Sequence, residues 1–274
     1  MRFDWYAATI SADSGDVVRA LVAGLGAEPV EARPLNGYQN AVKLVRDGST
    51  VCRVLWGGNG GAPHAFATSD DAPAFAALVR SLWPDRHYVT RADVAADFDD
   101  GDTTWERLYA SVLAVAQDRG LKKSQAGDWI DPDDGRTFYV GARKSAVFAR
   151  LYEKGKQLRA LATDGGADIS LNLVRLELVA RPDGEARRAA ARMEPEEFYG
   201  FADWSKQLAL DVFALDVDRV HIKERRESDD DRALFYAVKQ YHDHFERLAE
   251  RLGGWERVGP WIRAKREQME QSWR

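Results

Sequence analysis

The sequence predicts an α+β fold in which a largely antiparallel sheet, flanked by helices, is followed by a helical C-terminal part. Three segments, 87–98, 147–154 and 174–179, alternate apolar and charged residues with the period of two that half-buried strands show. Segments with helical periodicity separate other strand-like stretches. After Pro182 the chain is typical of helices to its end. These observations together indicate α+β rather than a purely helical or purely β fold.

The first third of the chain is expected to alternate strands and helices. Glycine ends the first expected helix and proline ends the second. Two turn signals, at 35–37 and 47–49, divide the middle segment into two or three strands. The expected elements are a strand at 3–10, a helix at 16–25, strands within 28–56 and a helix at 71–82.

The next part of the chain carries the charged strands. Thr103-x-x-Glu106 resembles a capping box and predicts a helix to about Arg119. Two strands, near 128–130 and 136–142, are expected to precede the strand that contains Tyr152. A polar segment at 155–170 then separates this strand from the last charged strand at 174–179.

A change of character near residue 182 predicts two parts, an α+β part over 1–182 and a helical part over 183–274. Within the helical part, residues 231–252 carry apolar residues at alternating spacings of four and three. This stripe fits either a helix packed on its own domain or a dimer seam. Its members are Leu234, Val238, Tyr241, Phe245, Leu248 and Leu252.

Composition limits the class of protein. Of 274 residues, 45% are hydrophobic and 30% are charged, which fits a folded protein with a real core. No apolar run approaches the roughly 20 residues that span a bilayer, and the single Cys52 excludes an internal disulfide framework. We therefore expect a cytoplasmic protein without a membrane partner. The net charge is −5, yet the stretch 141–162 holds six Lys and Arg and only one acid, so basic charge is local.

The charged residues of the three strands fall on one face of each strand. Opposite them lie apolar residues, so the charged faces can form one site on a sheet. The residues are Arg91, Asp93 and Asp97 on the first strand, Arg150, Tyr152 and Lys154 on the second, and Arg175 and Glu177 on the third.

Two interpretations of these residues stay open on periodicity alone. Asp93 and Glu177 fit surface carboxylates balanced by arginines, or ligands of a metal bound through oxygen, which indicates Mg²⁺ or Mn²⁺. Asp97 shares the face of Asp93 but begins an acidic cluster whose spacing fails the EF-hand pattern. Tyr152 fits a packing residue or a nucleophile, and the cations beside it would favour phenolate and bind phosphate.

Two further motifs indicate no chemistry. The glycine-rich stretch 57–61 lacks a following Gly-Lys-Ser/Thr, so we expect a plain loop and no nucleotide cofactor. His242 and His244 lie in the helical stripe, where residues two apart do not face each other, so a solvated helix face is expected.

Three motifs in order resemble those of one family. The sequence is similar to the trans-acting rolling-circle replication initiators, the Rep_trans family of small plasmids with relatives in filamentous phages and integrative elements. The family pattern is, in outline, T-R-x-D-x-A-x-D-F, then G-x-R-x-S-x-x-F-x-R-x-Y-x-K, then R-x-E-x-E or R-x-E-L. The matching stretches are VTRADVAADF at 89–98, FYVGARKSAVFARLYEKG at 138–155 and VRLEL at 174–178. Val179 stands where many plasmid members have a second acid.

The resemblance implies a DNA-nicking and religating enzyme with a tyrosine nucleophile and a divalent metal. It assigns the nucleophile to Tyr152, with Arg150 and Lys154 beside it, and the metal to Asp93 and Glu177, with Asp97 a weaker candidate. It assigns phosphate contacts to Arg143 and Ser145, with Lys144, Arg91 and Arg175 as further candidates for contacts with DNA. Residues 1–182 would then be the nicking core and 183–274 would recognise the origin, with Lys223–Arg226 as one candidate surface, or dimerise. The implied partners are partly single-stranded origin DNA, a host helicase and a second copy of the chain.

Three alternatives remain at this point. The chain could be a conjugative relaxase of an integrative element, with the same chemistry on a transfer origin. It could be a non-catalytic origin-binding regulator that keeps the fold. It could also be a metal nuclease that uses water, in which Tyr152 only packs.

Overall fold

The computed structural model describes residues 1–58, 60–131, 135–162, 167–220 and 229–272. Contacts divide the chain into two compact units, Met1–Lys223 and Glu224–Arg274. Among the described residues, no helix combines the length and apolar character needed to cross a bilayer.

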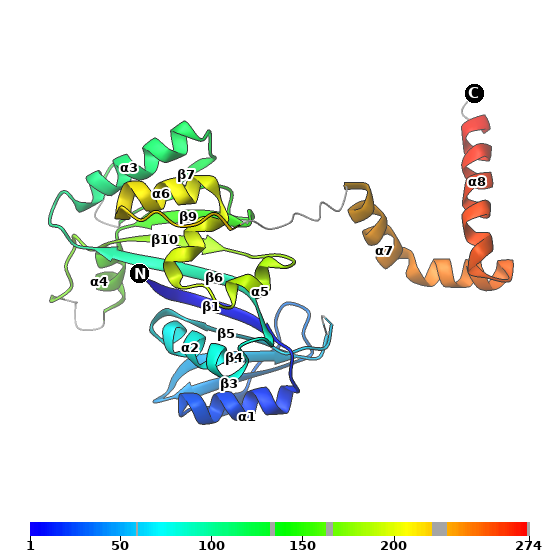
Figure 1. Cartoon of the computed structure of the whole chain (residues 1–274), viewed down its shortest axis with the longest axis horizontal. Coiled ribbons are helices and arrows are strands. Elements are labelled where there is room, and N and C mark those ends of the chain that lie inside the picture. The colour runs from blue at the N-terminus through cyan, green and yellow to red at the C-terminus, as the bar shows by residue number, and fades with distance from the viewer. Residues whose placement is uncertain (59, 132–134, 163–166, 221–228, 273–274) are drawn as a thin grey trace. The chain divides into compact units, whose positions relative to one another are not determined.

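The first unit is built on one ten-stranded sheet in which every neighbouring pair of strands is antiparallel (Figure 1). The strand order is β2-β3-β4-β5-β1-β6-β10-β9-β8-β7. The predicted α+β fold with a largely antiparallel sheet is therefore confirmed. The strands are β1 (Arg2–Ile10), β2 (Glu28–Glu31), β3 (Asn40–Arg46), β4 (Ser49–Trp56), β5 (His64–Thr68), β6 (His87–Phe98), β7 (Lys123–Gly127), β8 (Arg136–Val140), β9 (Val147–Tyr152) and β10 (Val174–Ala180).

One expected strand is displaced. The sequence placed it near 128–130, but β7 ends at Gly127. The Asp128 carboxylate accepts the backbone N–H groups of Ile130 and Asp131 at 2.8 and 2.9 Å, which forms a local turn. A backbone committed to this turn does not pair with a neighbouring strand, so the prediction for this segment is wrong.

Several helices of the first unit pack on one face of the sheet. In Figure 1, α2, α5 and α6 lie in front of the strands, and α2 packs on β1 and β5. The helical elements are α1 (Ser14–Leu25), η1 (Ser69–Asp71), α2 (Ala72–Leu82), α3 (Thr104–Asp118), α4 (Lys154–Leu161), α5 (Ala186–Ala190), η3 (Pro195–Phe201) and α6 (Asp203–Phe213). Because α5 and η3 contact β6, the first unit extends beyond residue 182 by its contacts. The functional division at that residue stays a prediction.

Local chemistry explains the ends of two helices. Asp13 caps α1 by accepting the N–H groups of Gly15 and Asp16, and Gly26 ends it with φ 59°, in the left-handed region that favours glycine. The expected capping box of α3 does not form, because Thr103 makes no side-chain cap bond. Thr104 instead accepts the Asp100 N–H at 2.8 Å and donates to the Gly101 carbonyl at 2.7 Å.

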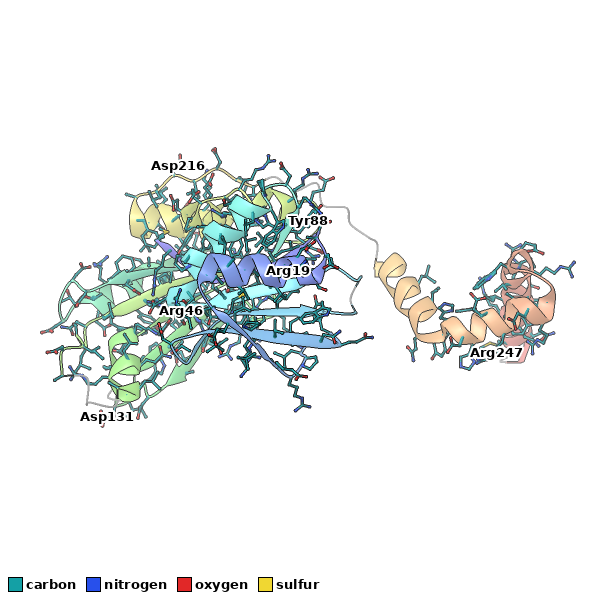
Figure 2. All side chains as sticks on the ribbon, turned by 90° about the horizontal axis from the view of Figure 1, so that it is seen from below. Arg19, Arg46, Tyr88, Asp131, Asp216 and Arg247 are labelled. Carbon is teal, nitrogen blue, oxygen red and sulfur yellow. The ribbon has the colours of Figure 1, made fainter. Side chains whose placement is uncertain are left out.

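The core lies under the helices. Val94, Leu151 and Leu176 are fully buried on this face of β6, β9 and β10. At the other end of the sheet, Arg46 of β3 (Figure 2) connects α1 and η1: it donates to the Leu25 carbonyl and pairs with Asp71 at 2.9 Å. The buried apolar face fixes the register and therefore leaves the charged residues on the opposite face.

The second unit contains α7 (Asp229–Leu252), η4 (Trp255–Arg257) and α8 (Val258–Ser272). α7 confirms the helix expected at 231–252, with non-helical backbone angles at Tyr241. His242 and His244 are exposed on α7, as expected. Leu234, Val238 and Tyr241 of the apolar stripe are also exposed within this unit, so a dimer seam stays a prediction. The basic segment 223–226 lies outside the described residues.

Candidate functional site

The register of β6, β10 and β9 brings the charged faces of the three strands together as one face. Three rows of opposing residues cross these strands. In the order β9, β10, β6 they are Tyr152, Arg175 and Asp97, then Arg150, Glu177 and Ala95, then Phe148, Val179 and Asp93. We call this surface the site face.

Tyr152 lies at the end of β9 with its side chain in contact with charged groups. It is only 9% exposed, and its hydroxyl donates to Glu177 Oε2 at 3.4 Å. The Arg150 guanidinium and the Lys154 ammonium lie 5.4 and 5.9 Å from its ring centroid. These two cations flank the phenol, as the sequence predicted.

The arginines beside Tyr152 favour its phenolate form, as expected, but burial outweighs them. Burial raises the pKa of Tyr152, and the Glu177 charge raises it further, while Arg175 and Arg150 oppose both effects without reversing them. The free hydroxyl is therefore a neutral donor at neutral pH. Ionising it requires a proton acceptor or additional positive charge at the site.

Glu177 is the most deeply buried acid of the site face. It is 0% exposed, and Arg150 Nη2 pairs with its Oε1 at 2.5 Å. Burial raises the pKa of Glu177 to about 7, with Arg150 opposing the shift and Asp93 and Asp4 adding to it. Its other oxygen accepts the hydrogen bond from the Tyr152 hydroxyl, so Glu177 links the tyrosine to an arginine.

Asp93 is held by Arg91 in a bidentate pair. Arg91 Nε and Nη2 lie 2.8 and 2.6 Å from the two carboxylate oxygens, and Asp93 is only 2% exposed. The same guanidinium lies over the Trp5 ring, 4.2 Å from its centroid. Arg91 is thus fixed on both sides rather than extended into solvent.

Arg175 is committed to carboxylates. It makes a bidentate pair with Asp97 at 2.5 and 2.7 Å and donates to Asp4 at 2.8 Å. Only 4% of Arg175 is exposed. These contacts leave Arg175 little access to a DNA phosphate, which was one of its predicted contacts.

The three predicted metal ligands do not converge on one point. Asp93 and Asp97 are four residues apart on β6, which is about 13 Å along a strand, too far to share an ion. Within the described ranges, no group of three His, Cys, Asp or Glu side chains could hold a metal. Glu177 lies in the row between them.

Asp93 and Glu177 nevertheless fit a hard divalent cation. Both are buried carboxylates on neighbouring strands, and the Asp93 charge contributes to the raised pKa of Glu177. Mg²⁺ is often held by only one or two carboxylates, with water and substrate phosphate completing its shell. To bind the cation, Asp93 and Glu177 would each have to free one carboxylate oxygen from Arg91 and Arg150. Asp97 is held by Arg175 and does not fit as a ligand of the same ion.

The basic loop between β8 and β9 carries three further predicted residues, Arg143, Lys144 and Ser145. All three are exposed, and the loop begins at Gly141, where φ is 85°. The Arg143 guanidinium lies 3.9 Å from the ring centroid of Tyr139, which pairs with Arg150 across β8 and β9. The loop therefore presents cations beside the site face.

Sequence reasoning missed Asp4, Trp5 and Arg181. Asp4 lies at a register shift between Phe3 and Trp5 on β1, where an extra residue interrupts the pairing with β6. This bulge is invisible to simple alternation, although a lone acid inside an apolar strand was a usable signal. Trp5 pairs with Asp93, and the Arg181 side chain donates to the Arg143 and Ser145 carbonyls.

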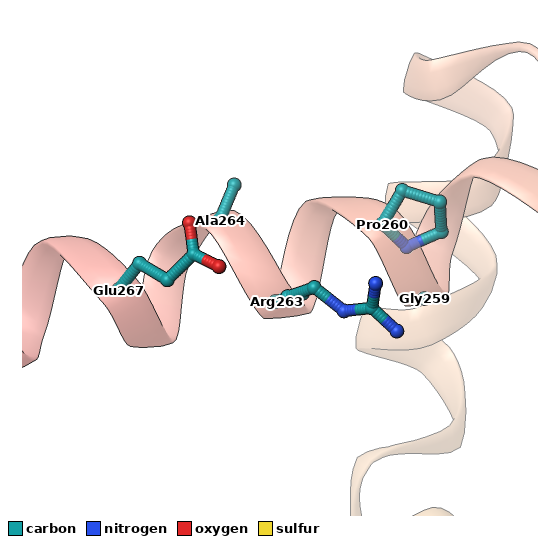
Figure 3. A pocket seen from close by; sticks show the side chains of 5 residues that line it. All are labelled: Gly259, Pro260, Arg263, Ala264 and Glu267. Carbon is teal, nitrogen blue, oxygen red and sulfur yellow. The ribbon is translucent and has the colours of Figure 1, made fainter.

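A hollow on α8 contains none of the predicted site residues (Figure 3). It is lined by Gly259, Pro260, Arg263, Ala264 and Glu267, all from one helix of the second unit. A single arginine and a single glutamate offer no arrangement comparable to the site face.

Comparison with known proteins places this arrangement in a family. A solved structure of a rolling circle replication initiator protein from Geobacillus stearothermophilus is similar with a TM-score of 0.52 and 19% identity, covering 83% of this chain and 89% of that chain. At this identity the likeness shows a common fold. No curated protein matches. A family model described as replication initiation factor, Rep_trans, matches residues 87–230, more than half of the chain and all of the charged strands. The chain therefore belongs to the Rep_trans family of replication initiation factors.

Proposed function

We propose that this protein nicks and rejoins one DNA strand at a replication origin, with Tyr152 as the nucleophile, and so initiates rolling-circle replication. The observation that carries the proposal is the contact of the Tyr152 hydroxyl with Glu177, on a face where arginines and Lys154 surround both. A phosphodiester needs a nucleophile, a proton acceptor and positive charge, and this face supplies all three.

The chemistry is an in-line transesterification. The Tyr152 oxygen bonds to the scissile phosphorus, its proton passes to Glu177 Oε2, and the bond from phosphorus to the 3′ oxygen breaks. The 5′ phosphate stays on the tyrosine, and the leaving 3′ oxygen takes up a proton to become a hydroxyl that can prime synthesis. The reverse reaction rejoins the strand, so no nucleotide cofactor is needed.

Positive charge around the tyrosine would stabilise the transition state. Arg150 and Lys154 lie against the ring of the nucleophile, so they are placed to contact the phosphate as it approaches. A Mg²⁺ or Mn²⁺ held by Asp93 and Glu177 would supply further charge neutralisation at the phosphate oxygens. The described acids provide no third ligand, so DNA and water would complete its shell.

Binding without cleavage is the second candidate. The ion pairs of Asp93 with Arg91 and of Glu177 with Arg150 favour it, because in a regulator these carboxylates would serve only as structural partners of the arginines. A regulator would bind origin DNA and leave it intact.

A covalent-adduct assay distinguishes the two. Supercoiled DNA and a labelled single strand, each carrying the element's own origin, are incubated with Mg²⁺ or Mn²⁺ and run on denaturing protein gels. We expect label to migrate with the wild type and with Tyr139→Phe, and to vanish with Tyr152→Phe. Tyr139 is the matched control, since it lies on the neighbouring strand β8.

Other outcomes decide the alternatives. A labelled adduct that persists in Tyr152→Phe sinks the nucleophile assignment. Nicking without any adduct indicates a nuclease that uses water. Binding of origin DNA without nicking, in the wild type and with both metals, establishes the regulator.

A further inference from the structure

The basic loop between β8 and β9 is tied down by one arginine that follows β10. The Arg181 side chain, through Nη1, donates to the backbone carbonyls of Arg143 at 3.1 Å and Ser145 at 3.0 Å. Its own backbone N–H donates to the Ala146 carbonyl at 2.7 Å, which continues the pairing of β10 with β9 beyond Val147. Three backbone carbonyls of the loop therefore accept hydrogen bonds from a single residue, Arg181.

Arg181 also belongs to the site face. It follows Glu177 and Val179 at intervals of two, and its guanidinium lies 5.1 Å from the ring centroid of Phe148, which pairs with Val179. Burial and the nearby charge of Arg91 lower the pKa of Arg181, while Asp93 acts in the opposite direction. The loop is thus anchored next to the arginine and carboxylate pairs of the site.

Arg181 differs from the other site-face arginines in its partners. Arg91, Arg150 and Arg175 each pair with a carboxylate. In the described parts of the chain, no carboxylate lies within salt-bridge distance of Arg181, Arg143 or Lys144. Uncompensated cations held close together repel one another, and a polyanion placed over them removes that repulsion.

We infer that Arg181 is a positioning residue that holds the 141–146 loop so that Arg143 and Lys144 bind the DNA backbone beside the scissile phosphate. The partner is a single strand, read through its phosphates and not its bases. The inference rests on the proposed function for the identity of the site, but it concerns binding and does not need the chain to cut DNA.

The salt dependence of DNA binding tests this role. The probe is a fluorescent oligothymidylate, which carries phosphates but no origin sequence, bound by the full chain over a range of salt concentrations. Each phosphate contact to a single strand contributes about 0.7 to the slope of log affinity against log salt. We expect Arg143→Ala to lower the slope by about 0.7 and Arg181→Ala by about 1.4, because the latter displaces both loop cations.

A double-mutant cycle separates positioning from direct contact. If Arg181 acts through the loop, Arg143→Ala changes the slope far less in the Arg181→Ala background than in the wild type. Arg181→Lys keeps a donor for the carbonyls and should restore most of the slope. Arg188→Ala, which removes an exposed arginine from α5 of the same unit, should change nothing.

Several results would overturn the inference. Additive effects in the cycle would mean that Arg181 contacts DNA independently, and an unchanged slope in Arg181→Ala would mean that the loop needs no anchor. Thermal unfolding checks that each variant folds, and the cycle is repeated with Arg181→Met, which also removes the donor to the two carbonyls, if the alanine variant does not. A wild type that binds the probe normally but forms no covalent adduct would refute the proposed function and leave this test intact.

In an origin-nicking assay the same variant should separate binding from chemistry. Arg181→Ala should raise KM with kcat nearly unchanged, since Tyr152, Glu177 and Arg150 keep their contacts. An equal loss in kcat would place Arg181 in the chemical step and contradict a positioning role.

Discussion

The site face and the neighbouring strands β1 and β5 form one wider surface, whose two halves keep charged and aromatic side chains out of water in different ways. On β6, β10 and β9, carboxylates and arginines neutralise one another in pairs such as Arg150 with Glu177. On β1 and β5, aromatic rings stack instead: Trp5 lies on Phe66 at 5.2 Å with an interplanar angle of 4°, and His64 stacks on Tyr38 at 6.0 Å. We call these the polar half and the aromatic half.

Arg91 joins the halves, because it holds Asp93 while lying on Trp5. The residues of the proposed chemistry, Tyr152 and Glu177, both lie in the polar half. Buried charge in the polar half is expensive unless every member is paired, whereas stacked rings tolerate the loss of one neighbour. The two halves should therefore respond differently to substitution and to pH.

The largest expected effect is in the polar half. Arg175→Met would leave the largely buried Asp4 and the partly exposed Asp97 without their shared partner, and removing one member of such a network costs about 3 kcal/mol. Urea unfolding measures the loss. Arg188→Met is the control and should stay within about 0.5 kcal/mol of the wild type. A loss no larger than that of the control would show that the network is not a stability element.

The next largest effect is a loss of folding stability at low pH, and it arises at His64 in the aromatic half. Burial lowers the pKa of His64 to about 4, with a smaller contribution from Arg187, so the folded state binds this proton less well than the unfolded chain. Neutral His64 therefore contributes to the free energy of unfolding. This contribution is fully present above the unfolded pKa of about 6.5 and is lost as pH falls towards 4. At about pH 5 the folded protein should have lost ~2 kcal/mol through this group.

His64→Phe removes the proton and keeps a ring beside Tyr38. The comparison is the difference in unfolding free energy between near-neutral pH and about pH 5, for wild type and variant. We expect the variant to lose less stability on acidification. Equal losses in both proteins would show that His64 titrates normally in the folded state.

The sequence predicted the polar half better than the aromatic half. Period-two alternation placed Arg91, Asp93, Tyr152 and Glu177 on common faces, because the apolar side of each strand must face the core. Which carboxylate meets which arginine depends on strand order and register, and these follow from the whole sheet. The pairing of Arg175 with Asp97 and Asp4 was therefore not predictable from local pattern.

The aromatic half escaped sequence reasoning for a related reason. Trp5, His64 and Phe66 lie on β1 and β5, which are neighbours only because β1 sits in the middle of the sheet. The bulge at Asp4 adds a residue to one strand, so alternation counted from either end gives different faces. Tyr152 posed a different problem: the sequence shows the cations near it but not its burial, and burial decides its pKa.

The smallest expected effect is at the junction of the two halves. Arg91→Lys keeps the positive charge beside Asp93 but loses the bidentate geometry and the flat contact with Trp5, because an ammonium is a point charge on a flexible stem. We expect a loss of about 1 kcal/mol in urea unfolding, with Arg188→Lys as the unchanged control. Combining Arg91→Lys with Trp5→Phe tests the connection directly. If Arg91 joins the halves, the double variant is less destabilised than the sum of the single variants, since the stacking contact can be lost only once. Strict additivity would mean that Asp93 alone fixes Arg91 and that the polar and aromatic halves are energetically separate.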